Sequence, residues 1–216
     1  MSALQNSTPD PPLLIGIAGG SGSGKTTIAE RIAELLPECS LLALDCYYRD
    51  LSKLSPAERR QTNFDHPIAL EQEAIVRDLR LLKHAGIVFA PIYDFNTHCR
   101  TSITKRIAPG KFIVVEGLFT LHWPELRDLL DVKVFVEAQD EICLLRRQRR
   151  DARERGRSPE SVLHQYEATV RPMFEAFIAP TKQFADIVLQ GAGDLDLSRK
   201  EILKIVQQRS HSRQSQ

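Results

Sequence analysis

This sequence lacks the features of a membrane, secreted or strongly charged protein. No apolar run approaches the roughly 18 residues that a membrane-spanning helix needs, and the first basic side chain is Lys25, so the N-terminus lacks the basic region of a signal peptide. Lysine and arginine total 29 against 28 aspartate and glutamate, a net charge of +1. No global field therefore draws the chain to nucleic acid or to an anionic membrane. We expect a soluble, cytoplasmic protein with neither kind of partner.

Cysteine is also scarce. The four cysteines, at positions 39, 46, 99 and 143, form no Cys-x-x-Cys pair and have no histidines at zinc spacing. Neither a disulfide framework nor a structural metal site is therefore indicated, and a reducing compartment fits best. The balance of 42% hydrophobic and 26% charged residues over 216 positions is that of a globular protein with a core of its own.

Short apolar runs alternate with helical patterns along the chain. The runs are residues 13–18, 41–44, 112–115, 132–136 and 187–189, and the helical patterns are 25–36, 70–84, 142–153, 159–177 and 195–207. Runs that are apolar throughout are typical of a parallel sheet covered on both faces. We therefore predict a doubly wound α/β fold with a mainly parallel five-stranded sheet. Residues 86–110 read as a β-hairpin insert, residues 13–208 as one domain, and residues 1–12 and 209–216 as flexible termini.

A glycine-rich motif follows the first predicted strand and opens a helix. It consists of Gly19, Gly20, Ser21, Gly22, Ser23, Gly24, Lys25 and Thr26 and fits G-x-x-x-x-G-K-[ST]. Inward-turned backbone N–H groups and a helix N-terminus attract phosphate, Lys25 reaches the β- and γ-phosphates, and Thr26 can bind Mg²⁺. Thr27 is the next candidate nucleotide-binding residue. The alternative is a flexible turn, but strand, motif and helix together predict a P-loop site for a nucleoside triphosphate.

Two carboxylates follow predicted strands that end at the same edge of the sheet. Asp45 follows residues 41–44 and Glu116 follows residues 112–115. Ligands bind at this edge in doubly wound folds, so one acid can serve Mg²⁺ while the other accepts a proton from an attacking hydroxyl. The alternative for each is a polar residue that caps the next helix.

Seven arginines lie between positions 146 and 157 and are followed by Ser158 and Pro159. One reading of the run is a nucleic-acid-binding patch. Asp151 and Glu154, which interrupt the run, and the near-neutral charge of the whole chain disfavour it. A solvated helix face is a second reading. The third is a helical lid over residues 146–160, hinged at Gly156, because phosphoryl transfer needs cations over the transferred group.

Taken in order, these motifs resemble the uridine kinase (uridine-cytidine kinase) family of P-loop kinases. The resemblance rests on the P-loop and on further segments from residue 44 to residue 186, namely Leu44–Asp50, Asn63–Pro67, Pro91–Phe95 with His98, Val114–Gly117, Arg150–Asp151, Glu154–Arg157, Gln165–Tyr166, Pro180–Lys182 and Ala185–Asp186.

The resemblance implies transfer of the γ-phosphoryl group of ATP or GTP to the 5′-hydroxyl of uridine or cytidine. It assigns proton acceptance to Asp45 and places Glu116, Thr26 and Asp45 near Mg²⁺. The other roles it implies are catalytic cations at Lys25, Arg150 and Arg155, ribose binding at Asp65 and Arg147, pyrimidine binding at Tyr93 and His98, further nucleoside contacts at Tyr48, Phe64, Phe95, Arg157 and Gln165, and a contact of Asp194 with the ATP base. The family resemblance also implies a homotetramer.

Simpler readings of the substrate residues stay open. In these readings His98 is an exposed hairpin residue with no role in binding, and Tyr93 and Phe95, two positions apart, form one hydrophobic face of a strand. Related kinases act on pantothenate, phosphoribulose or nicotinamide riboside, and the hairpin and lid residues distinguish them. A GTPase switch is disfavoured because neither Thr104-Lys105 nor Thr181-Lys182 continues into the guanine-reading Asn/Thr-Lys-x-Asp motif.

Overall fold

A computed structural model describes residues 10–214. Its main sheet has five strands in the order β2-β5-β1-β6-β7, and every neighbouring pair is parallel. The strands are β1 (Leu13–Gly19), β2 (Cys39–Ala43), β5 (Phe112–Glu116), β6 (Val132–Glu137) and β7 (Ile187–Gln190). The predicted doubly wound α/β fold is confirmed.

Helices of several kinds connect the strands. The α-helices are α1 (Lys25–Leu35), α2 (Pro56–Gln61), α3 (Gln72–Lys83), α4 (Pro124–Arg127), α5 (Asp140–Arg155), α6 (Pro159–Gln165), α7 (Arg171–Met173) and α8 (Leu195–Gln214). The 3₁₀ helices are η1 (Leu44–Tyr47), η2 (Pro67–Ala69) and η5 (Ala179–Phe184), and π-helical turns form η3 (Tyr166–Val170) and η4 (Phe174–Ile178).

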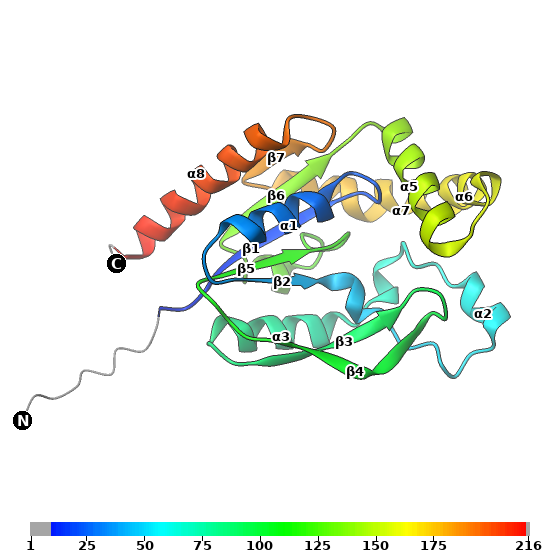
Figure 1. Ribbon diagram of the computed structural model, residues 1–216, viewed down its shortest axis with the longest axis horizontal. Coiled ribbons are helices and arrows are strands. Elements are labelled where there is room, and N and C mark those ends of the chain that lie inside the picture. Colours follow the sequence, from blue (N-terminus) through cyan, green and yellow to red (C-terminus); the bar gives the residue numbers. More distant parts are fainter. Residues whose placement is uncertain (1–9, 215–216) are drawn as a thin grey trace, which may run out of the picture.

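Alternate residues of the central strands enter two separate cores. Leu14 and Ile113 belong to the core shared with α3 and the hairpin, whereas Ile15 and Val114 belong to the core shared with α1 and α8. Figure 1 shows α1 and α8 on one side of the sheet and α3 on the other. Both faces of each strand are thus covered, which is why the strand sequences are apolar throughout.

The predicted insert is a two-stranded antiparallel hairpin. It consists of β3 (Val88–Asp94) and β4 (Cys99–Ile107), with a register shift between Pro91 and Tyr93. Val88, Ala90, Tyr93 and Ile107 are buried against the α3 core, while most of β4 is exposed. The hairpin lies beside the sheet without joining it, and the turn between β3 and β4 lies on the same side of the molecule as α2 and α5 (Figure 1).

The C-terminus differs from the expectation of a flexible segment over residues 209–216. Helix α8 continues to Gln214, because Ile202 and Val206 are buried against the sheet and Arg209 forms an ion pair with Asp186 at 3.1 Å. At the other end, residues 10–12 precede β1 without regular structure, and residues 1–9 and 215–216 lie outside the described residues. Within residues 10–214, no helix has the length and apolarity to cross a bilayer.

Candidate active site

The P-loop follows β1 directly and opens α1. Gly24 is the N-cap of α1 at φ +100°, and Gly22 has φ +82° with the carbonyl oxygen of Cys143 only 2.4 Å from where a Cβ would stand. Both positions require glycine because a side chain would meet strain or backbone. Without a capping side chain, the first N–H groups of α1 remain available to an anion.

A cavity of about 420 Å³ lies on this loop, between α5 and the turn after β7. Its lining residues are Gly22, Gly24, Lys25, Thr26, Thr27, Arg146, Arg147, Arg150, Gly191, Ala192 and Gly193. Backbone N–H groups, a helix N-terminus and cationic side chains are groups that suit a polyphosphate. The predicted residues Lys25, Thr26 and Thr27 meet here.

Arg146 holds the outer side of this cavity together. Its guanidinium donates to the carbonyl oxygens of Gly22 and Ser23, at 3.2 Å each, and to that of Gly191 at 3.0 Å. It therefore ties the P-loop to the turn after β7. No motif in the sequence assigns Arg146 an individual role, although its spacing of four residues from Arg150 places both on one face of a helix.

Thr26, Glu116 and Asp45, the residues predicted to bind Mg²⁺, lie at the carboxyl edge of the sheet. The hydroxyl of Thr26 donates to Glu116 Oε2 at 3.3 Å, and Glu116 is buried at the end of β5. Burial raises the pKa of Glu116, the charge of Lys25 opposes this shift, and Asp45 adds to it. The charges of Lys25 and Asp45 thus act on Glu116, as expected for side chains that meet at the carboxyl edge of the sheet.

These groups suit a magnesium ion that is shared with phosphates. Among residues 10–214, no group of three or more His, Cys, Asp or Glu side chains is arranged to hold a metal alone. Mg²⁺ in phosphoryl-transfer sites takes one or two protein oxygens and completes its shell with water and substrate phosphates. Thr26 with Glu116, and Asp45 with a buried Oδ1 that has no partner among the described residues, fit that requirement.

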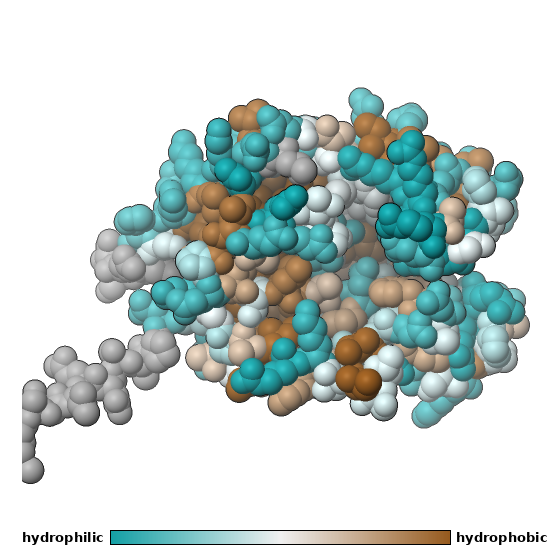
Figure 2. All heavy atoms as spheres, in the orientation of Figure 1, coloured by the Kyte–Doolittle hydropathy of each residue, from teal (hydrophilic) through white to brown (hydrophobic). Residues whose placement is uncertain are grey.

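A second, larger cavity of about 690 Å³ adjoins the first and shares Lys25, Arg147 and Arg150 with it. Its walls come from η1, the segment around α2, the hairpin turn, α5 and α6. The predicted residues among its lining are Ser21, Lys25, Asp45, Tyr48, Phe64, Asp65, Phe95, His98, Arg147, Arg150, Arg155, Arg157 and Gln165. Figure 2 shows hydrophilic side chains gathered over α5 beside the hollow that separates it from the hairpin. The two cavities thus meet at three cationic side chains.

Asp65 and Arg147 form a buried charged pair in this cavity. Arg147 Nη1 lies 3.5 Å from Asp65 Oδ1 and donates to Ser21 Oγ at 2.9 Å, while Nη2 donates to Gln165 at 3.2 Å. Asp65 Oδ2 has no hydrogen-bond partner in the described part of the chain. Burial raises the pKa of Asp65, and the charge of Arg147 opposes that shift.

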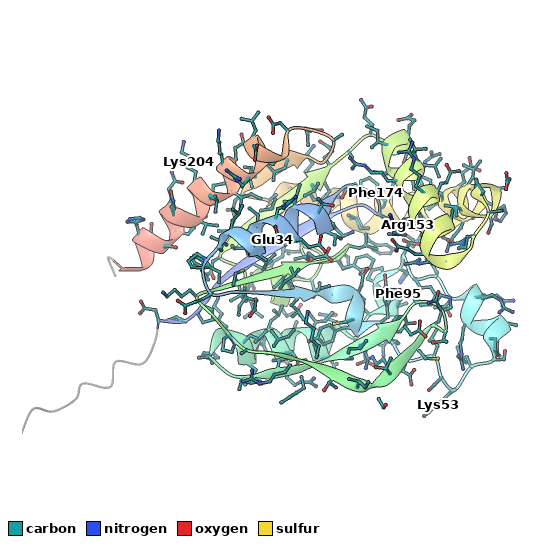
Figure 3. The ribbon with its side chains drawn as sticks, in the orientation of Figure 1. Glu34, Lys53, Phe95, Arg153, Phe174 and Lys204 are labelled. Carbon is teal, nitrogen blue, oxygen red and sulfur yellow. The ribbon has the colours of Figure 1, made fainter. Side chains whose placement is uncertain are left out.

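The opposite wall is aromatic. His98 stacks on Phe64 with ring centroids 4.7 Å apart, and Phe95 and Tyr48 pack edge to face at 6.3 Å. His98 has φ +55°, and its Nδ1 is buried without a partner among residues 10–214. Burial, followed by the charge of Arg155, lowers the pKa of His98, so the imidazole is neutral at neutral pH. Figure 3 shows Phe95 at the hairpin end, below α5.

Tyr93 occupies a different place from that of its predicted partner His98. Tyr93 does not line the larger cavity, and its ring lies 5.5 Å from the ring of Tyr48 and 5.4 Å from that of Phe95, which do. Its hydroxyl is buried and has no partner within the described residues. Burial raises its pKa, so the hydroxyl keeps its proton and remains a donor.

Comparison with known proteins agrees with this geometry. Residues 14–198 match the phosphoribulokinase / uridine kinase family. The chain belongs to this family.

Relatives within the phosphoribulokinase / uridine kinase family align over most of the chain. A uridine kinase of Ligilactobacillus salivarius is 44% identical over 204 residues, which cover 92% of this chain and 96% of the relative. A uridine kinase of Shewanella amazonensis is 47% identical over 187 residues, or 84% and 88% of the two chains. The solved phosphoribulokinase of Rhodobacter spheroides superposes with a TM-score of 0.63 at 16% identity, covers 86% of this chain and 74% of that one, and supports the fold alone.

In this family member the arginine run is built around one buried carboxylate. Asp151 has no exposed surface and forms ion pairs with Arg150 at 2.8 Å and with Arg157 at 3.2 Å, while Arg155 lies 3.7 Å away. Gly156, at φ +61°, ends α5, and Ser158 caps α6. In the sequence, Asp151 interrupts the run and belongs to one motif of the family resemblance, but its burial cannot be predicted because it depends on how α5 packs.

Asp194 lies beside the first cavity, one residue beyond its lining. Its carboxylate accepts the backbone N–H of Asp196 at 2.7 Å, which is the bond of a helix cap at the start of α8. The resemblance-based contact with the ATP base stays a prediction. Backbone groups at Gly191, Ala192 and Gly193 line that side of the cavity.

Proposed function

We propose that this chain, like its relatives, is a uridine kinase. It transfers the γ-phosphoryl group of ATP or GTP to the 5′-hydroxyl of uridine or cytidine and releases UMP or CMP. Membership of the family and relatives at 44% and 47% identity support this proposal. The reaction makes the chain a phosphotransferase that acts on an alcohol group.

The main support for a nucleoside substrate is a set of buried polar atoms around one cavity that have no hydrogen-bond partner within residues 10–214. Buried side-chain atoms of Asp45, Asp65, His98 and Arg147 have no hydrogen-bond partner within residues 10–214, and all four residues line the cavity next to the P-loop. Buried polar groups in proteins are almost always bonded. These atoms therefore suit a polar ligand, and the stacked aromatic wall suits a flat base.

The proposed mechanism assigns each wall of the site one task. Asp65, oriented by Arg147, accepts the ribose hydroxyls, and the aromatic wall with His98 holds the pyrimidine. Asp45 then receives the proton of the 5′-hydroxyl, while Lys25, Arg150 and Arg155 stabilise the charge on the transferred group. Mg²⁺, held by Thr26, Glu116 and Asp45, would neutralise charge on the phosphates.

Two wider properties belong to the same proposal. The four cysteines are free thiols, which suits the reducing cytoplasm where ATP is abundant. Assembly into a homotetramer, which the family resemblance implies, is proposed as well, and sedimentation of the purified chain measures it directly.

A product assay tests the proposed function. Purified protein is incubated with Mg²⁺, ATP or GTP, and one of uridine, cytidine, 2′-deoxyuridine, adenosine, nicotinamide riboside or pantothenate, and the product is identified by mass. We expect UMP and CMP with the highest kcat/KM values. Preference for pantothenate, or for a sugar phosphate added to the panel, would refute the pyrimidine assignment and leave the kinase assignment standing.

His98→Ala should relax the choice of base. The substitution removes a buried nitrogen that faces the base, so discrimination of uridine from adenosine should fall by about tenfold, the effect of one buried polar contact. His84→Ala, at an exposed position outside the cavity, is the matched control. The measurement is kcat/KM for both nucleosides at pH 7.5, where the lowered pKa keeps His98 neutral. Equal selectivity in the wild type and His98→Ala would contradict the role in base reading.

The pH dependence of KM for uridine should follow the ionisation of the Asp65 carboxyl group. An ionised carboxylate accepts two hydroxyls and a neutral one does not, so KM for uridine should rise as the pH falls through the raised pKa of Asp65. This loss should begin where an exposed aspartate, with its pKa of about 3.9, is still ionised. Arg147→Met removes the opposing charge and should shift the loss to higher pH.

The control is KM for ATP in the same buffers, which should not follow the uridine profile. Asp65→Asn, which cannot ionise, should remove the acid limb altogether while raising KM at every pH. A uridine profile that is unchanged in Arg147→Met would refute the charged-pair interpretation.

A further inference from the structure

Arg100 on β4 joins the hairpin to the turn that carries Asp45. Its guanidinium donates from Nε to the carbonyl oxygen of Tyr48 at 3.0 Å and from Nη2 to that of Tyr47 at 3.1 Å. Nη1 forms an ion pair with Glu71 at 3.0 Å. The side chain keeps only 22% of its surface exposed. One guanidinium thus bonds three separate acceptors.

The turn held in this way is η1 (Leu44–Tyr47). It has no capping side chain at its start, and a 3₁₀ helix of four residues has poor hydrogen-bond geometry of its own. The carbonyl of Tyr47 also accepts the backbone N–H of Glu71 at 3.1 Å, so the end of η1 is fastened by Glu71 and Arg100 together. Asp45 belongs to this same turn and lines the larger cavity.

The same arginine belongs to the hairpin that faces the nucleoside. Arg100 stands opposite Tyr93 in the β3–β4 ladder, and its backbone N–H donates to Asp50 at 3.0 Å. The ring of Tyr93 packs on that of Tyr48, whose hydroxyl donates to the carbonyl oxygen of Phe64. Arg100 therefore connects the aromatic wall to the backbone that follows the catalytic acid.

We propose that Arg100 is a positioning residue for phosphoryl transfer, which sets Asp45 and the base-binding hairpin in one fixed relation. The inference rests on the proposed function, because it deepens the role of Asp45 there. A nucleoside that is held by its base at the hairpin presents its hydroxyl to Asp45 only while this connection is intact. Small displacements of this kind have large kinetic effects, since a 1 Å misplacement costs up to about a hundredfold in rate.

The test compares Arg100→Met with Arg106→Met, a change at an exposed arginine on the same strand. We expect kcat with uridine to fall at least about tenfold in Arg100→Met and to stay within about twofold in Arg106→Met. KM for ATP should stay within about twofold in both variants, because the P-loop lies on a different element. Thermal unfolding of each variant shows whether it is folded at the assay temperature.

A double-mutant cycle separates positioning from general stability. If Arg100 acts through Asp45, Arg100→Met should lower kcat by less than about threefold in an Asp45→Asn background, where that acid no longer accepts the proton. An arginine that only supports the fold would cost the same in both backgrounds. Equal losses in the two backgrounds, or an unchanged kcat in Arg100→Met, would overturn the proposal.

Arg100→Lys covers the case in which Arg100→Met does not fold. Lysine keeps the charge but lacks the planar fork that reaches three acceptors at once, so kcat should still fall at least about threefold. Wild-type kcat in this variant would overturn the proposal. Inactivity of both the wild type and Arg106→Met on every nucleoside would instead overturn the proposed function, and the inference with it.

Discussion

Lys25→Ala should lower kcat/KM with uridine and ATP by roughly a hundred- to a thousandfold, the usual cost of removing one preorganised charge from a transition state. Lys25 begins α1, keeps 8% of its surface exposed and lines both cavities. It thus lies where the two cavities meet, which is where the proposed transfer takes place. Its charge also opposes the rise in the pKa of Glu116, so its loss should favour protonation of that carboxylate.

The control for this experiment is Lys204→Ala, at an exposed position on α8, far from the hairpin in Figure 3. Steady-state kinetics should leave Lys204→Ala at the wild-type rate, and thermal unfolding should show both variants folded. Wild-type turnover by folded Lys25→Ala would refute the assignment of the P-loop as the phosphate site.

Asp45→Asn should lower kcat by about a hundredfold or more and leave KM for uridine nearly unchanged, since general-base effects run from roughly 10² to 10⁴. The amide keeps the shape of the carboxylate but can neither take a proton nor give a charge to Mg²⁺. Asp45 lines the larger cavity with a buried oxygen that has no partner in the described part of the chain, which is the geometry that this role requires.

Asp128→Asn, at an exposed aspartate beyond α4, is the matched control and should turn over at the wild-type rate. Steady-state kinetics with uridine at saturating ATP measures both constants. The proposed mechanism would be contradicted if Asp45→Asn kept the wild-type kcat and raised only KM for uridine. Asp45 would then bind the nucleoside, and another group would accept the proton.

Much of the fold could be predicted because it is encoded locally. Continuous apolar runs mark strands that are buried on both faces, and the order of strands and helices restricts them to a doubly wound sheet. The P-loop was predictable for a similar reason, since strand, glycines, lysine and helix are adjacent in the chain. Asp45 and Glu116 could be placed together because parallel strands end at one edge.

Predictions that depended on packing were less complete. Asp151 looked like a charge that interrupts a basic run, yet it is the buried centre of that run. The tail from residue 209 looked polar and flexible, yet α8 extends over it to Gln214. Pyrimidine binding by Tyr93 stays a prediction, and the packing of its ring on Tyr48 and Phe95 was not foreseen. Local polarity does not reveal which side of an element another element covers.

The sequence by itself therefore determined the architecture and singled out the P-loop and the candidate acids, because periodicity and short-range motifs express backbone physics within a few residues. Only the tertiary structure decided how the walls of the site are joined. Arg100 reaches Tyr47 and Tyr48 across 53 and 52 positions of the chain, and Arg146 reaches Gly22 across 124. Such contacts arise from the packing of whole elements, and no spacing in the sequence encodes them.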